Sequence, residues 1–99
     1  MSAKNENVAV ADGETWVRLT DSAATVVSIT LSNTGASEMI VMGTTGSTPV
    51  AGTEDGVRFF PGDGIANMTM ADLFPGVTAT QVWARSIAKA GDMFVSHAA

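Results

Sequence analysis

The chain has 99 residues, enough for one domain, and only 15% are charged, against roughly 25% in average globular proteins. Its formal net charge of −5 and its five scattered Lys and Arg residues argue against nucleic acid as a partner, because phosphate contacts need clustered basic side chains. The absence of cysteine excludes disulfides, thiolate metal sites and a cysteine nucleophile.

Residues 1–7 are polar and predict a flexible N-terminal arm ahead of one β-sandwich domain over residues 8–99. The arm lacks the charged and apolar regions of a secretory signal. No apolar run approaches the roughly 18 residues that a membrane helix needs. We therefore expect a chain made in the cytoplasm, without a membrane partner. We also expect its charge-poor surface to be covered in part by self-association or by docking on a larger body.

Apolar and polar residues alternate with a period of two in short stretches separated by Gly, Pro, Asn and Asp, which is the pattern of β-strands. The predicted strands cover residues 8–11, 15–19, 25–33, 39–43, 56–60, 65–70, 80–86 and 93–97. About eight short antiparallel strands at such even spacing predict an all-β fold, a single β-sandwich or a jelly-roll-like barrel.

Some stretches carry more specific expectations. Asp12-Gly13 predicts a hairpin turn between the first two strands. In the third strand, Val27, Ile29 and Leu31 are expected to share one face. The continuous apolar run at 39–43 predicts a central strand buried on both faces, and residues 71–74 fit either a strand continuation or one turn of helix. The 13 residues of 43–55 form a long loop, of the kind that is usually functional or disordered.

The residue types that carry chemistry do not form a catalytic pattern. Asp and Glu residues flank predicted turns, where Asp beside Gly has an ordinary local role. His97 is the single histidine and lies near the C-terminus, and no Gly-x-Ser-x-Gly elbow surrounds any serine. The glycines of Pro61-Gly62-Asp63-Gly64 lack the helix and lysine of a phosphate loop. We expect no enzymatic activity, no catalytic residue, no metal site and no cofactor.

The aromatic residues indicate a role in packing or binding and not in catalysis. Trp83 and Arg85 share one face of a predicted strand, and three roles fit them: a place in the core, a protein interface, or a sugar-stacking platform. Trp and Arg are both enriched at protein–protein interfaces. The residues that we expect at an interface are Trp83, Arg85, Phe59, Phe60 and His97.

From Trp16 to the end, an alternating strand with an Asn stop precedes an apolar strand, two Pro-Gly corners, a Trp-containing strand and a closing strand. These segments are Val27–Asn33, Met39–Ser47, Phe59–Gly64, Leu73–Gly76, Val82–Ser86 and Phe94–Ala98. In this order they resemble the small virion proteins of tailed bacteriophages, in which a Pro-Gly corner, a Trp-Ala-x-Ser strand and a Val-Ser terminus recur.

The resemblance implies a structural role without catalytic residues. The expected form is a capsid decoration or cement protein, a homotrimer that binds the major capsid protein on the outer face of a phage head and stabilises it. Such a protein is synthesised in the host cytoplasm and located on the virion surface. The alternative is a tail- or fibre-associated module that binds host surface glycans, which Trp83 beside Arg85 and the loop 43–55 would favour.

Overall fold

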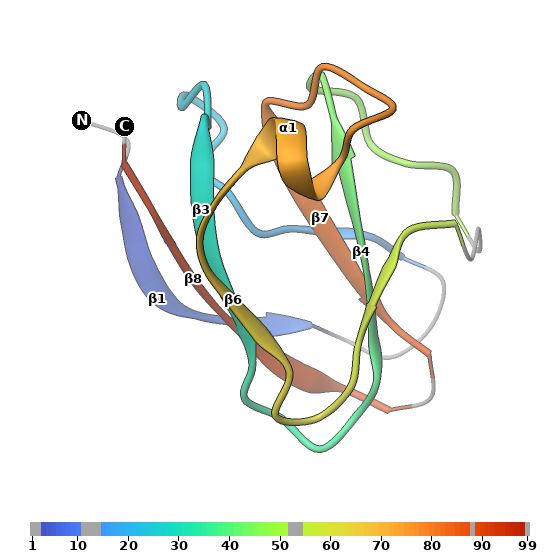
Figure 1. Cartoon of the computed structure of the whole chain (residues 1–99). Coiled ribbons are helices and arrows are strands. Elements are labelled where there is room, and N and C mark those ends of the chain that lie inside the picture. Colours follow the sequence, from blue (N-terminus) through green and yellow to red (C-terminus); the bar gives the residue numbers. More distant parts are fainter. Residues whose placement is uncertain (1–2, 11–14, 52–54, 88, 99) are drawn as a thin grey trace.

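The computed structural model describes residues 3–10, 15–51, 55–87 and 89–98. In this part of the chain, eight strands form two antiparallel four-stranded sheets that pack face to face (Figure 1). One short helix lies between β6 and β7. The elements are β1 (Lys4–Val10), β2 (Val17–Arg18), β3 (Ser28–Asn33), β4 (Met39–Thr44), β5 (Val57–Phe59), β6 (Gly64–Thr69), α1 (Met70–Leu73), β7 (Gln81–Ser86) and β8 (Gly91–His97). The prediction of an all-β sandwich of short antiparallel strands is confirmed.

The order of the strands shows how the sandwich is wound. Sheet A has the order β1-β8-β3-β6, and sheet B has the order β2-β7-β4-β5. Four of the pairs join strands that are progressively closer together in the sequence. They are β1 with β8, β2 with β7, β3 with β6 and β4 with β5. The chain is thus folded in half at the β4–β5 connection, and the pairs β3 with β8 and β4 with β7 roll this double ribbon into two sheets. Eight strands wound in this way form a jelly roll.

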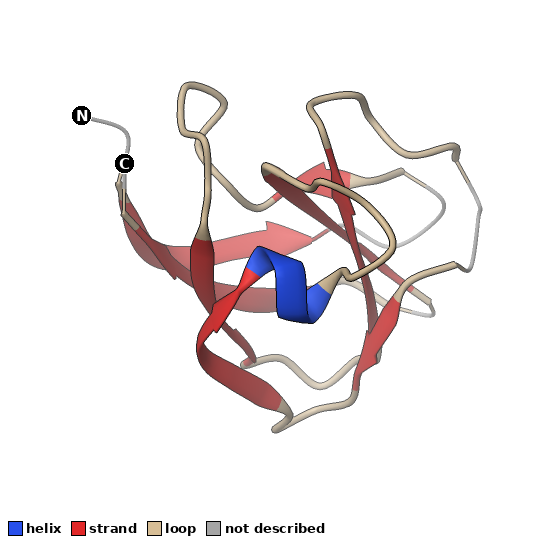
Figure 2. Cartoon of the chain, turned by 45° about the horizontal axis from the view of Figure 1, so that its top comes forward, coloured by secondary structure: helices blue, strands red, loops and turns tan. Residues whose placement is uncertain are grey.

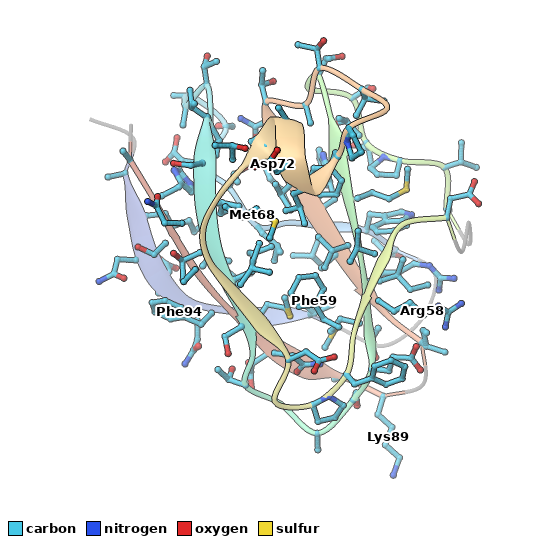
Figure 3. The ribbon with its side chains drawn as sticks, viewed as in Figure 1. Arg58, Phe59, Met68, Asp72, Lys89 and Phe94 are labelled. Carbon is cyan, nitrogen blue, oxygen red and sulfur yellow. The ribbon has the colours of Figure 1, made fainter. Side chains whose placement is uncertain are left out.

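The core between the sheets is filled by alternate residues of the strands, as the period of two predicts. In β8, Met93 and Val95 point inward and are fully buried, whereas the labelled Phe94 lies on the outer face of sheet A (Figure 3). In β7, Val82 and Ala84 belong to the same core. Each fully buried aliphatic side chain of this kind stabilises the fold by about 1.5–3 kcal/mol.

β4 is the central strand that its apolar run predicts. It lies between β7 and β5, and Met39, Ile40 and Val41 are all 0% exposed. Met39 and Val41 face the core between the sheets, while Ile40 faces the outer side of sheet B. Full burial of Ile40 means that the outer side of this sheet is itself covered.

The expected position of Val27 is wrong. Ile29 and Leu31 are buried, but Val27 is 73% exposed and precedes the start of β3. The alternation of buried and exposed residues is interrupted just before the strand. The last buried residue ahead of β3 is Val26, which is three positions before Ile29, whereas strict alternation would require two or four. Alternation extended backwards past Ser28 therefore assigns Val27 to the wrong face.

The predicted hairpin between the first two strands is also wrong. β1 pairs with β8 in sheet A, whereas β2 pairs with β7 in sheet B. The Asp12-Gly13 turn lies outside the described residues. β1 begins at Lys4, so residues 4–7, which the polar sequence assigns to the arm, face β8 from His97 to Phe94. An edge strand needs no alternating apolar pattern for this, since main-chain hydrogen bonds make the pairing.

Deleting residues 2–7 tests the pairing of this polar segment. The deletion leaves the end of β8 without its neighbour, and we expect a loss of unfolding free energy of about 1 kcal/mol for each main-chain hydrogen bond removed. Urea unfolding, compared with a variant in which Asn5 and Asn7 are both replaced by serine, measures the effect. An unchanged unfolding midpoint in the deleted chain would show that these residues act as a free arm.

Residues 70–73 form one turn of helix, which settles the choice that the sequence leaves open. Thr69 caps the helix, its Oγ1 accepting a hydrogen bond from the Asp72 main-chain N–H at 3.2 Å. The turn follows directly on β6 and leads into the loop before β7 (Figure 2), and it directs Phe74 onto β4. A Cβ atom at Gly43 would lie 2.5 Å from the Phe74 ring, so glycine is what lets the ring approach the strand.

Candidate interaction surfaces

The outer face of sheet B carries both tryptophans and all three arginines of the chain. The sequence Trp-x-Arg occurs twice, as Trp16-Val17-Arg18 and as Trp83-Ala84-Arg85. β2 and β7 are antiparallel neighbours, and their register places Arg18 opposite Trp83. We call the following set the Trp–Arg face: Trp16, Arg18, Ile40, Met42, Arg58, Trp83 and Arg85.

In this face the arginine of each Trp-x-Arg segment lies over the tryptophan of the other segment. The Arg18 Cζ atom is 4.6 Å from the centre of the Trp83 ring, and the Arg85 Cζ atom is 5.8 Å from that of Trp16. Both distances are within the range of cation–π attraction. The result is a ladder of alternating indole and guanidinium groups across two strands.

Hydrogen bonds fix both indoles. Trp83 Nε1–H donates to Thr44 Oγ1 at 2.9 Å, and Trp16 Nε1–H donates to the Val50 carbonyl at 2.9 Å. The second bond anchors the β4–β5 loop, the long loop expected at 43–55, at the Trp–Arg face. Trp16 and Trp83 are 5% and 6% exposed. Trp83 is therefore part of a second buried cluster within the chain.

Four of the five residues expected at an interface are buried in the chain itself. Trp83, Arg85 and His97 are each 6% exposed and Phe59 is 3% exposed, whereas Phe60 is 53% exposed. Trp83 and Arg85 lie together in the Trp–Arg face. Phe59 faces the core between the sheets. Phe60 is the one of the five whose side chain is open to a partner.

His97 holds the C-terminal strand to a neighbouring loop. Its Nε2 accepts a hydrogen bond from the Asp21 main-chain N–H at 3.2 Å, and its Nδ1 lies 2.8 Å from the Ala98 carbonyl. A carbonyl oxygen only accepts, so Nδ1 carries the hydrogen and Nε2 is the acceptor. Both ring nitrogens are thereby engaged in fastening the end of the sandwich.

An apolar groove opens beside α1. It has a volume of about 640 Å³ and none of the residues that line it is charged. They are Thr25, Val26, Val27, Thr69, Met70, Ala71, Pro75, Val77, Thr78, Ala79 and Thr80. Val27 and Val77 are 73% and 52% exposed, so two large aliphatic side chains stand at its surface. Sequence reasoning missed this groove, because alternation assigned Val27 to the core.

Two of the described aspartates hold turns through local hydrogen bonds, the ordinary role of Asp in loops. Asp63 Oδ2 accepts a hydrogen bond from the Phe60 N–H at 2.9 Å, and Asp21 Oδ1 accepts one from the Ala23 N–H at 2.8 Å. Among the residues that the structure describes, no group of three or more His, Cys, Asp and Glu side chains could hold a metal ion.

Comparisons of the chain with protein-family models, with curated proteins and with solved structures found no match. In the described ranges of the chain, no helix has the length and apolarity to cross a membrane.

Proposed function

We propose that this chain is a structural binding protein, and that it decorates the outer face of a phage head as a cement protein. The observation that carries the proposal is the uncharged groove beside α1. Exposed contiguous apolar surface on a soluble domain is typical of a protein–protein contact site. Docking on the major capsid protein would cover Val27 and Val77 and remove them from water.

Two further observations support this reading. The strand order is that of a jelly roll, an architecture used by viral capsid domains among others, although a fold does not determine a function. The segment order from Trp16 onward resembles small phage virion proteins. A cement protein on a shell of repeated subunits would act as an oligomer, for which we propose a trimer located on the virion surface.

Binding to head shells tests the proposal directly. Purified protein is added to expanded shells assembled without it, and bound copies and the temperature of shell disruption are measured. We expect stoichiometric binding and a higher disruption temperature. A protein that neither binds these shells nor protects them would refute the decoration role.

Replacing Val77 with aspartate tests whether the groove is the contact. Val77 is more than half exposed, so the free protein should keep its stability to within about 0.5 kcal/mol. Burying an unpaired carboxylate against the shell should weaken binding at least about tenfold. Val50→Asp is the matched control, because Val50 is 78% exposed and lies outside the groove. Equal binding by both variants would place the contact elsewhere.

The glycan-binding alternative lacks a surface indole on which a sugar could stack. Both tryptophans of the chain are at most 6% exposed, and Arg18 covers the Trp83 ring. Sugar platforms need an accessible aromatic face, so we pursue the decoration role instead.

A further inference from the structure

Phe60 is an aromatic side chain that the fold leaves more than half open to solvent. It is 53% exposed and belongs to neither hydrophobic cluster, whereas Phe59 beside it is 3% exposed and points between the sheets (Figure 3). The corner that carries Phe60 is closely tied. The Phe60 N–H donates to Asp63 Oδ2 at 2.9 Å, and the Asp63 N–H donates to the Phe60 carbonyl at 2.9 Å. A fixed corner therefore presents the ring, and little backbone freedom would be lost when a partner covers it.

Phe60 has two neighbours on the outer side of sheet B. Just beyond the paired ends of β5, β4 and β7, the residues Phe60, Glu38 and Ile87 form a row across the sheet. The Ile87 N–H donates to the Glu38 carbonyl at 3.2 Å, which continues the ladder by one residue. Side chains alternate along a strand, so this row faces the same side as Ile40 of the Trp–Arg face. Ile87 is 37% exposed, and apolar surface thus lies on both sides of Glu38.

The charges beside these two apolar side chains cancel. Arg58, which projects from the side of the sandwich in Figure 3, places its Nη1 atom 2.9 Å from Glu38 Oε2, and the two side chains are 40% and 26% exposed. Asp63 and Lys89, in the connections that follow β5 and β7, add one charge of each sign. We call the following set the Phe60 patch: Glu38, Arg58, Phe60 and Ile87.

A second copy of this chain fits the Phe60 patch. Copies that each carry a net charge of −5 repel one another, and at this patch they can meet without bringing like charges together. A face that holds both an acid and a base also complements itself, because in a ring of copies Arg58 of one copy can approach Glu38 of the next. Aromatic residues and arginine are both enriched in contacts between proteins.

We infer that the Phe60 patch is the surface through which copies of this chain contact one another, with Phe60 and Ile87 packed against the next copy and the charged pair at the rim. The inference rests on the proposed function for the number of copies, three around one axis. None of the four patch residues lines the groove beside α1, so the groove stays open to the shell.

Sedimentation equilibrium of the full chain over the micromolar range tests this contact. We expect wild type to form a trimer. Phe60→Asp should weaken association at least about tenfold, because the contact would then bury an unpaired carboxylate. Phe60→Leu keeps an apolar side chain and should weaken association less.

Val50→Asp is the matched control, because Val50 is 78% exposed, lies outside the Phe60 patch and gains the same charge. It should leave association unchanged. Urea unfolding of each variant at a concentration where the chain is monomeric should give the wild-type midpoint, which separates a lost contact from a lost fold. If Phe60→Asp fails to fold, Phe60→Leu still decides, since a trimer that it leaves as tight as wild type would refute the contact.

The inference is overturned if wild type stays monomeric over this range, if Phe60→Asp leaves the trimer intact, or if Val50→Asp dissociates it equally. A monomeric wild type whose binding to shells is weakened by Phe60→Asp would also overturn it, because the occupant of the patch would then be the shell protein.

Shell binding separates this inference from the proposed function. A trimer that depends on Phe60 but does not bind shells would refute the decoration role and leave the contact between copies intact. A monomer that binds and protects shells would refute the contact between copies and leave the decoration role intact.

Discussion

Replacing Trp83 with alanine is expected to lower the free energy of unfolding by about 3–5 kcal/mol, the range for removing a buried tryptophan. The side chain is 6% exposed and packs with Trp16 and Ile40 in the second cluster. Its loss opens a cavity in that cluster. It also leaves Thr44 without its donor and removes the ring that lies under Arg18. A domain of this size has a total stability of about 5–15 kcal/mol, so the variant should lose a large fraction of its stability.

Urea unfolding and sedimentation together distinguish a buried Trp83 from one that joins subunits. In the structure Trp83 is covered by its own chain, so the isolated protomer should lose stability. Trp83→Phe retains part of the apolar contact but loses the hydrogen bond to Thr44 and one ring of the indole, and we expect it to cost less than the alanine variant. An alanine variant that keeps its unfolding midpoint but dissociates from an oligomer would contradict this assignment.

The sequence predicts the strands well where one face of the strand is buried and the other is exposed to solvent. In β8, Met93, Val95 and His97 alternate with Phe94 and Ser96, and the structure buries the first set. The apolar run of β4 likewise predicts a strand covered on both sides. In each case the pattern depends only on the pleat of the strand itself, so no knowledge of neighbouring strands is needed.

The predictions fail where the answer depends on which segments meet. The repeated Trp-x-Arg pattern at Trp16 and Trp83 is visible in the sequence, but only the antiparallel register of β2 and β7 turns it into a ladder of stacked groups. The groove likewise depends on a shift of phase before β3, which exposes Val27. Residues 4–7 of β1 show the same limit, because this polar half of an edge strand is specified by its pairing with β8 and has no apolar pattern to reveal it.

The sequence predicts that Asn33 ends a strand, but it does not reveal the hydrogen bonds that the Asn33 side chain makes to distant carbonyls. Asn33-Thr34-Gly35 is expected to end a strand, and β3 does end at Asn33. The side chain then binds segments on both sides of the turn. Its Nδ2 donates to the carbonyls of Ser37 at 2.7 Å and Phe59 at 2.9 Å, and its Oδ1 accepts from the Gly35 N–H at 3.1 Å. Asn33 is 2% exposed, so these bonds are made away from water.

Replacing Asn33 with alanine should therefore cost about 3 kcal/mol, because it leaves the carbonyls of Ser37 and Phe59 without a donor in a buried setting, at about 1–3 kcal/mol for each unsatisfied group. Urea unfolding at neutral pH measures the loss. Asn33→Asp has the same size and separates hydrogen bonding from packing. A carboxylate places oxygen instead of N–H against the two carbonyls, so this variant should be at least as unstable as the alanine variant. If Asn33→Asp retained wild-type stability, the two donated bonds would not be what holds β3 to the β5 end of the sandwich.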